Sequence, residues 1–305
     1  QVMMRFIRQK YNLNFGVMVQ PQQSKYIQDY QGVHVDTVRN VVNVSPTLDF
    51  RYRFSKMSNL RINYRGTTSQ PSISQLLDIT DNSDPLNISM GNPGLKPSFT
   101  QNFRLFYNNF VQNHNKGIMT FVNFSTTNNS ISNKVTYDET TGGRITRPEN
   151  INGNWNAMGA FMFNCSIDSA GVWNINTGAH ANYNNYVSYL SLDKKSDSQK
   201  NTTRSITWRQ NLSFSYRNDW AEFSLDGTLT YNKAKNKLQP TSNLETWQFS
   251  YGPSMTLTAP WGTSLNSSLS INSRRGYNDS SMNTDEFVWN AQLSQGFLKG
   301  KPLTI

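Results

Sequence analysis

The sequence predicts an all-β protein, an antiparallel meander of strands that forms part of the wall of a large transmembrane barrel. Apolar and polar residues alternate with a period of two along most of the chain, and short and long connections between these segments also alternate. Charged residues make up only 16% of the 305 residues. No stretch approaches the roughly 20 consecutive apolar residues that a membrane-spanning helix needs. Strands are therefore the elements that could cross a bilayer.

The alternation is clearest in Leu60–Arg65, where Leu, Ile and Tyr occupy every second position and Arg, Asn and Arg lie between them. Successive side chains of a strand point to opposite faces, so this segment has one apolar face and one polar face. We find about 13 such segments, most of them near the ~10-residue length of a tilted membrane-spanning strand. Other clear examples are Phe50–Phe54, Phe103–Tyr107, Phe161–Ile167, Trp208–Arg217, Phe223–Tyr231, Leu265–Asn272 and Phe287–Leu293.

The connections fall into two classes that alternate along the chain. The short class comprises Arg8–Lys10, Ser55–Asn59, Gln112–Gly117, Asp168–Gly171, Asn218–Asp219, Pro260–Thr263 and Leu298–Lys301. The long, polar class comprises Ser24–Asn40, Thr68–Lys96, Asn128–Asn152, Leu192–Thr202, Lys233–Asn243 and Arg274–Asp285. In a meander, alternate turns lie at opposite ends of the strands, and outer-membrane barrels have short turns inside the cell envelope and long loops outside. The sorting therefore predicts an outer-membrane barrel.

Aromatic residues with a polar tip cap several of the apolar faces. Such side chains favour the membrane–water interface, so we expect the apolar face to meet lipid and the polar face to line a lumen. The alternative is a large soluble β-fold in which the same aromatic residues belong to a core. The capping residues are Tyr64, Tyr107, Trp208, Tyr216, Tyr231, Trp261 and Trp289.

Residues 70–97 resemble the barrel of TonB-dependent outer-membrane receptors, and most closely the outer-membrane β-barrel family common in Bacteroidetes. The most specific segment is Gly91–Pro97, followed by an alternating strand, and Leu298–Leu303 is similar to a turn before the closing strands. In that family, the segment that corresponds to Gly91–Pro97 ends an extracellular loop and starts the next strand. The motif residues are Gln70, Pro71, Ser72, Gln75, Leu76, Asp81, Asn82, Pro85, Leu86, Gly91, Asn92, Pro93, Leu95, Lys96 and Pro97.

The resemblance implies a barrel of about 22 strands, a plug domain inside it and a periplasmic segment that contacts TonB. We expect residues 1–305 to be the C-terminal part of such a barrel, incomplete at both ends and without the plug, since the chain begins with Gln1 and stops inside a strand that starts at Leu303. The implied location is the outer membrane of a Gram-negative bacterium, as a multi-pass barrel.

The expected function is TonB-dependent uptake of a scarce solute. The alternative is a surface barrel that does not transport, such as an adhesin, an assembly partner or a porin-like structural protein. A plug and a TonB-contact segment in the full-length protein would distinguish the two. Expected partners are outer-membrane lipid and lipopolysaccharide, the protein's own plug and TonB, and a surface lipoprotein is a further candidate.

Basic residues exceed acidic ones by 29 to 19, a balance that is also found in nucleic-acid-binding proteins. Here, however, many arginines occupy the polar face of strands, so we expect no nucleic acid as a partner. Guanidinium groups that line a lumen could pair with carboxylates of a plug or could attract anionic solutes. The candidate lumen-facing residues are Arg51, Arg53, Arg61, Arg65, Arg104, Arg209 and Arg217.

We find no catalytic or cofactor-binding constellation and expect no enzymatic activity. The histidines His34, His114 and His180 are far apart in the sequence, and the single cysteine, Cys165, allows no internal disulfide framework. The acidic loop 78–84 could offer oxygen ligands to Ca²⁺, but it lacks the glycine and the terminal glutamate of an EF-hand loop. Asp and Asn that cap their own backbone explain this loop more simply, so we assign no metal site.

Overall fold

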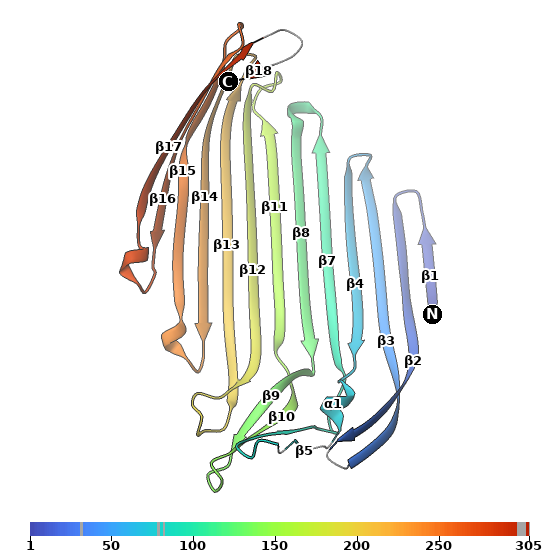
Figure 1. Ribbon diagram of the computed structural model, residues 1–305. Coiled ribbons are helices and arrows are strands. Elements are labelled where there is room, and N and C mark those ends of the chain that lie inside the picture. Colours follow the sequence, from blue (N-terminus) through green and yellow to red (C-terminus); the bar gives the residue numbers. More distant parts are fainter. Residues whose placement is uncertain (31–32, 78–79, 82, 298–302, 305) are drawn as a thin grey trace.

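The computed structural model describes residues 1–30, 33–77, 80–81, 83–297 and 303–304. Its main feature is one curved sheet of 14 strands, each antiparallel to its neighbours (Figure 1). The strands, in spatial order, are β1 (Val2–Ile7), β2 (Tyr11–Tyr30), β3 (Val33–Ser55), β4 (Ser58–Ser69), β7 (Ser98–Val111), β8 (Lys116–Asn128), β11 (Asn154–Ser166), β12 (Trp173–Leu190), β13 (Gln199–Arg217), β14 (Ala221–Asn236), β15 (Leu244–Thr258), β16 (Thr263–Arg275), β17 (Asp285–Phe297) and β18 (Leu303–Thr304).

The spatial order follows the sequence order, so the predicted all-β antiparallel meander is confirmed. The sheet does not close on itself: β1 and β18 lie at its two edges. The expected total of about 22 strands therefore stays a prediction.

The predicted sorting of connections is confirmed for the connections that the structure describes, except between β2 and β3, where most of the expected long loop is a hairpin. Short turns join β1 to β2, β3 to β4, β7 to β8, β11 to β12, β13 to β14 and β15 to β16 at the end of the sheet drawn uppermost in Figure 1. The opposite end carries the long connections and a second sheet in the order β5-β6-β10-β9. Its strands are β5 (Thr80–Asp81), β6 (Asn87–Met90), β9 (Ser130–Tyr137) and β10 (Arg144–Ile151). The long connections also hold the short helices α1 (Ile73–Leu76), η2 (Pro240–Ser242) and η3 (Ser280–Met282), whereas η1 (Asn113–Asn115) lies in the short turn between β7 and β8.

Three of the predicted long loops are more ordered than the sequence indicated. Within Ser24–Asn40, β2 continues to Tyr30 and β3 starts at Val33, so most of this segment is a hairpin. The segment Asn128–Asn152 contains β9 and β10, and β14 runs on to Asn236. A polar composition does not prevent a strand, because the backbone hydrogen bonds of the ladder do not depend on apolar side chains. The predicted turn at 298–301 lies outside the described residues.

Strand register extends each face across the whole sheet, because directly paired residues of antiparallel strands share a face. We call the face that carries Leu60, Ile62 and Tyr64 the apolar face, and the face that carries Arg61 and Asn63 the polar face. On the apolar face, Ile62 pairs with residues 50 and 105 on the neighbouring strands, which are also apolar.

Two aromatic belts cross the apolar face. We call the one nearer the long loops the outer belt, which includes Tyr64, Phe103, Phe124, Trp155, Tyr183, Trp208, Tyr231 and Trp247; several of its neighbouring rings lie 4.3–6.2 Å apart between centroids. The inner belt lies near the short turns and includes Tyr52, Phe54, Tyr107, Trp173, Phe214, Tyr216 and Phe223. On β12 the belts lie at Trp173 and Tyr183, roughly 33 Å apart along the strand, or about 25 Å along the membrane normal at a 40° tilt. This spacing equals the apolar band of an outer-membrane barrel.

Candidate functional site on the polar face

All seven candidate arginines lie on the polar face. Arg51 is directly opposite Arg61, Arg65 pairs with Thr47, and Arg104 pairs with Asn63. Arg53 pairs with Asn59 on the same face. The remaining two lie farther along the sheet on β13, where Arg209 pairs with His180 and Arg217 pairs with Glu222. The structure thus brings five of the seven together on β3, β4 and β7 and leaves the other two apart.

Within this arginine group, the carboxylate of Asp49 forms ion pairs with two of the five arginines. The Oδ2 atom of Asp49 lies 2.9 Å from a terminal nitrogen of Arg61, and its Oδ1 atom lies 3.3 Å from Nε of Arg51. Asn63 also donates to Asp49 through its side-chain amide. Because Arg51 and Arg61 face each other, this carboxylate offsets a like-charge pair that would otherwise weaken the strand pairing.

The other arginines of the group have no acidic partner among the described residues. Arg104 donates only to the amide oxygen of Asn123, at 3.4 Å, and no hydrogen bond or ion pair is found for the side chains of Arg53 and Arg65 within the described part of the chain. All three are exposed. Their positive charge is therefore available to a group outside this sheet.

A hollow of about 730 Å³ lies over these residues and is lined by Asp49, Arg51, Arg61, Arg65 and Arg104, among others. A second hollow of about 710 Å³ lies toward the short turns and shares two of these arginines. Its other charged residues are all basic: Arg8, Lys10, Arg53 and Lys56. We call the two hollows together the basic groove.

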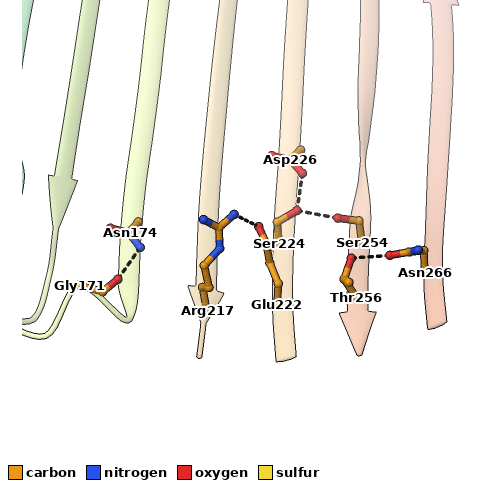
Figure 2. Close-up of polar contacts among 9 residues, drawn as sticks. All are labelled: Gly171, Asn174, Arg217, Glu222, Ser224, Asp226, Ser254, Thr256 and Asn266. Carbon is orange, nitrogen blue, oxygen red and sulfur yellow. Dashed lines mark hydrogen bonds and ion pairs between the residues drawn. The ribbon is translucent and has the colours of Figure 1, made fainter. Parts of the chain in front are cut away.

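The polar face of β12–β17 is different, because its charges balance and its polar groups bond to one another. Figure 2 shows part of it: Ser224 bonds to Asp226 at 2.6 Å and to Ser254 at 2.7 Å, and Arg217 pairs with Glu222 at 2.6 Å. On these strands the polar face carries three arginines, Arg209, Arg217 and Arg274, and three acidic residues, Glu222, Asp226 and Glu286. The net positive charge of the polar face is confined to its other half.

Sequence reasoning missed an apolar strip on the polar face beside the basic groove. The register pairs Phe106 with Phe121, Met119 with Met162, and Asn123 with Met158. Met162 is 53% exposed and Met119 is 38% exposed. The sequence contains one sign of this strip, because Phe106 is an apolar residue at a polar-face position between Leu105 and Tyr107. Only the register shows that such residues on β7, β8 and β11 lie next to one another.

The family-motif loop connects the main sheet to the second sheet. Ser72 caps the short helix α1 and forms a reciprocal capping box with Gln75. Gln70 lies at the start of the loop, where it donates to Asn43 at 2.8 Å and accepts from Arg39 at 3.2 Å. Pro71 accepts from the same arginine through its carbonyl oxygen, at 3.4 Å. Leu76 ends the helix.

The end of this motif holds β10 in place. The side chain of Asn92 donates to the carbonyl of Pro148 at 2.9 Å, and the backbone of Lys96 exchanges two hydrogen bonds with the side chain of Asn150, at 2.8 and 3.0 Å. Leu95 is only 5% exposed. A Cβ on Gly91 would lie 1.6 Å from the carbonyl oxygen of Leu77, so no larger residue fits there. Pro93 and Pro97 flank this segment.

The acidic part of the motif acts on its own backbone. Asp81 accepts from the backbone N–H of Ser83 at 3.1 Å, and Asp84 accepts from that of Leu86 at 3.0 Å. A hydrogen bond donated by the Asn87 side chain, together with the one from the backbone N–H of Leu86, holds the pKa of Asp84 below its usual range. Pro85 lies within this turn, while Asp78 and Asn82 lie outside the described residues. Within the described ranges, no three acidic, His or Cys side chains gather as a metal site.

Residues 6–222 match the model of the outer membrane protein beta-barrel family, and the match covers more than two thirds of the chain. The protein belongs to this family. A search of curated proteins found no match. Membership implies the outer membrane, as predicted, and makes the apolar face with its two belts the surface that meets lipid. None of the described helices is both long and apolar enough to cross a membrane.

Proposed function

We propose that this chain forms part of the barrel wall of a TonB-dependent receptor that takes up a scarce solute across the outer membrane. The observation that carries the proposal is the apolar strip beside the basic groove. In a water-filled lumen, apolar side chains such as Met162 would be exposed to water, at a free-energy cost of roughly 25 cal/mol for each Å² of apolar surface. A protein segment inside the barrel would cover this surface.

The width of the wall supports the same proposal. Fourteen strands form a sheet that is still open. Barrels of 16–18 strands enclose an aqueous channel and those of about 22 strands a plugged lumen, because side chains alone cannot fill so wide an interior. A plug in contact with the apolar strip would also bring its carboxylates near the basic groove, where Arg53, Arg65 and Arg104 have no acidic partner among the described residues.

Different parts of the chain would then act at different steps of uptake. The long loops and the second sheet offer the surface that first meets the solute outside the cell. The apolar strip and the basic groove hold the plug in one orientation, and the neutral hydroxyl and amide groups of β12–β16 line the other side of the lumen. Energy from TonB would rearrange the plug and open a path along that neutral side.

Photo-crosslinking in the full-length protein tests the plug. A benzophenone side chain at Met162, on the apolar strip, is expected to form an intramolecular crosslink to a segment outside residues 1–305. The same group at Phe161, the adjacent residue on the apolar face, is the matched control and is expected to form none. Crosslinks from neither position, or equal crosslinks from both, would contradict the placement of a plug on this face.

Growth experiments test the transport itself. Deletion of this gene and deletion of tonB are each expected to abolish uptake of the same scarce nutrient, and a complementing copy of this gene is expected to restore it only when TonB is present. Unchanged uptake of every nutrient tested in the gene deletion would favour the alternative, a surface barrel that does not transport.

A further inference from the structure

A basic cluster lies on the apolar face just beyond the outer belt, toward the long loops. It consists of Arg204 on β13 and of Lys233 and Lys235 on β14. Arg204 is directly opposite Lys235, and Lys233 is two residues from Lys235 on the same face. Directly paired residues have Cβ atoms about 5 Å apart and diagonal neighbours about 7–8 Å, so the three cationic groups can meet around one anion.

The cluster is only partly neutralised within the chain. Lys233 pairs with Glu245, at 2.6 Å between Nζ and Oε2. Arg204 donates to the neutral amide oxygen of Asn185 at 3.2 Å. Lys235 is exposed and lies beyond ion-pair distance of the described acidic groups. Three positive charges therefore share one carboxylate, and the like charges of Arg204 and Lys235 face each other.

Two other basic residues at this end of the apolar face have acidic partners. Arg275 binds both carboxylate oxygens of Asp285, at 2.8 and 2.7 Å, and Lys25 lies 3.3 Å from Asp36. The contrast shows that the positive charge of the cluster is a local feature of β13 and β14.

The position of the cluster identifies the class of ligand. Lys233 is two residues beyond Tyr231 of the outer belt, and Arg204 is four residues beyond Trp208. At about 3.3 Å for each residue, the cluster begins roughly 7–13 Å beyond the belt along the strands. Aromatic belts lie at the level of the lipid headgroups, so the cluster faces the headgroups of the outer leaflet. A cationic cluster on a lipid-facing surface complements a phosphorylated headgroup.

We propose that Arg204, Lys233 and Lys235 bind a phosphate group of the lipid A part of lipopolysaccharide. The phosphate would lie between Arg204 and Lys235 and remove their mutual repulsion, while the acyl chains would lie on the apolar face below. The site rests on family membership and on strand register, and it is independent of whether the barrel transports a solute.

Titration of the full-length protein tests this site. The protein is reconstituted in phosphatidylcholine nanodiscs, and bisphosphorylated lipid A and dephosphorylated lipid A are each titrated in, with binding followed by native mass spectrometry. Replacement of one cluster residue by Gln is expected to weaken binding of bisphosphorylated lipid A about fivefold, and replacement of all three on the order of a hundredfold. Binding of the dephosphorylated lipid is expected to be weak in every variant.

The control is the double variant Lys25→Gln/Arg275→Gln, which removes two neutralised charges from the same face and end. Its affinity is expected to stay within about twofold of the unaltered protein. The single variant Lys235→Gln keeps the test informative if the triple variant fails to fold, because the Lys235 side chain makes no hydrogen bond or ion pair with the described residues. Equal binding by the cluster variants and the unaltered protein, equal binding of both lipids, or an equal loss in the control would each overturn the site.

Discussion

Replacement of Leu212 by Arg should test which face of the sheet meets hydrocarbon. Leu212 lies on the apolar face of β13, four residues from Trp208 of the outer belt and four residues from Tyr216 of the inner belt. At about 3.3 Å for each residue, it is about 13 Å along the strand from either belt, at the midplane of the bilayer. Arginine at this depth costs about 2–4 kcal/mol of folding free energy in an outer-membrane barrel.

Packing losses do not explain a cost of that size. The Leu212 side chain is 55% exposed in the sheet, so the loss of its buried apolar surface on replacement by Arg accounts for only about 1 kcal/mol. The matched control is Ser213→Arg, one residue along on the polar face, where the new guanidinium would be directly opposite Asp226. We expect this variant to stay within about 0.5 kcal/mol of the unaltered protein.

The measurement is reversible urea unfolding of the full-length protein in phospholipid vesicles. A third variant, Ile206→Arg, places the charge beyond the outer belt and is expected to cost only about 0–1 kcal/mol, since the cost falls toward the interface. Equal costs at positions 212 and 213, or a larger cost at 206 than at 212, would refute the assignment of the apolar face to lipid.

Three further predictions concern single contacts. Asp49→Asn is expected to destabilise the protein by about 1 kcal/mol, because Arg51 and Arg61 then face each other without a carboxylate; Arg51→Gln in the same chain is expected to restore most of the loss in urea unfolding. Gly91→Ala is expected to cost about 1–3 kcal/mol through the clash with the carbonyl of Leu77 and to make the motif loop sensitive to protease, whereas Gly94→Ala, whose Cβ would lie 3.2 Å from the end of a side chain, is not. The backbone N–H groups of Trp173 and Val172 hold the pKa of Asp168 below its usual value, so this turn is expected to be fully protected above the usual pKa of an aspartate and to lose protection as the pH falls through the lowered pKa. Amide hydrogen exchange at Trp173 measures this, and Asp168→Asn is expected to remove the pH dependence.

The fold was predictable from the sequence because side-chain direction alternates along a strand whatever its partners are. Leu60–Arg65 shows both faces without knowledge of any neighbour. The sorting of connections needed only their lengths. The hairpin at Ser24–Asn40 was not predicted, because its polar residues resemble those of a loop and its order comes from pairing between β2 and β3.

The candidate site was predictable only in part, for the same reason. That Arg51 and Arg61 lie on a polar face follows from local alternation, but that they face each other across one carboxylate depends on register. The role of Asn92 in the motif depends on Pro148, which is 56 residues away in the sequence. Contacts between residues on different strands or loops could not be predicted, because the sequence of one segment does not fix which residues of another segment it pairs with.

The two halves of the polar face also differ in what they require from a partner. On β12–β16, Ser224 bonds to its neighbours and Arg217 has its own carboxylate, so an occupant that replaces water there gains little. On β3–β11 an occupant would cover the apolar strip and would offer carboxylates to Arg65 and Arg104, for which the described part of the chain provides none. A plug would therefore be stabilised against the N-terminal half of this wall and remain separable from the C-terminal half. A path for solute that opens between plug and wall would form along β12–β16, where few contacts must break.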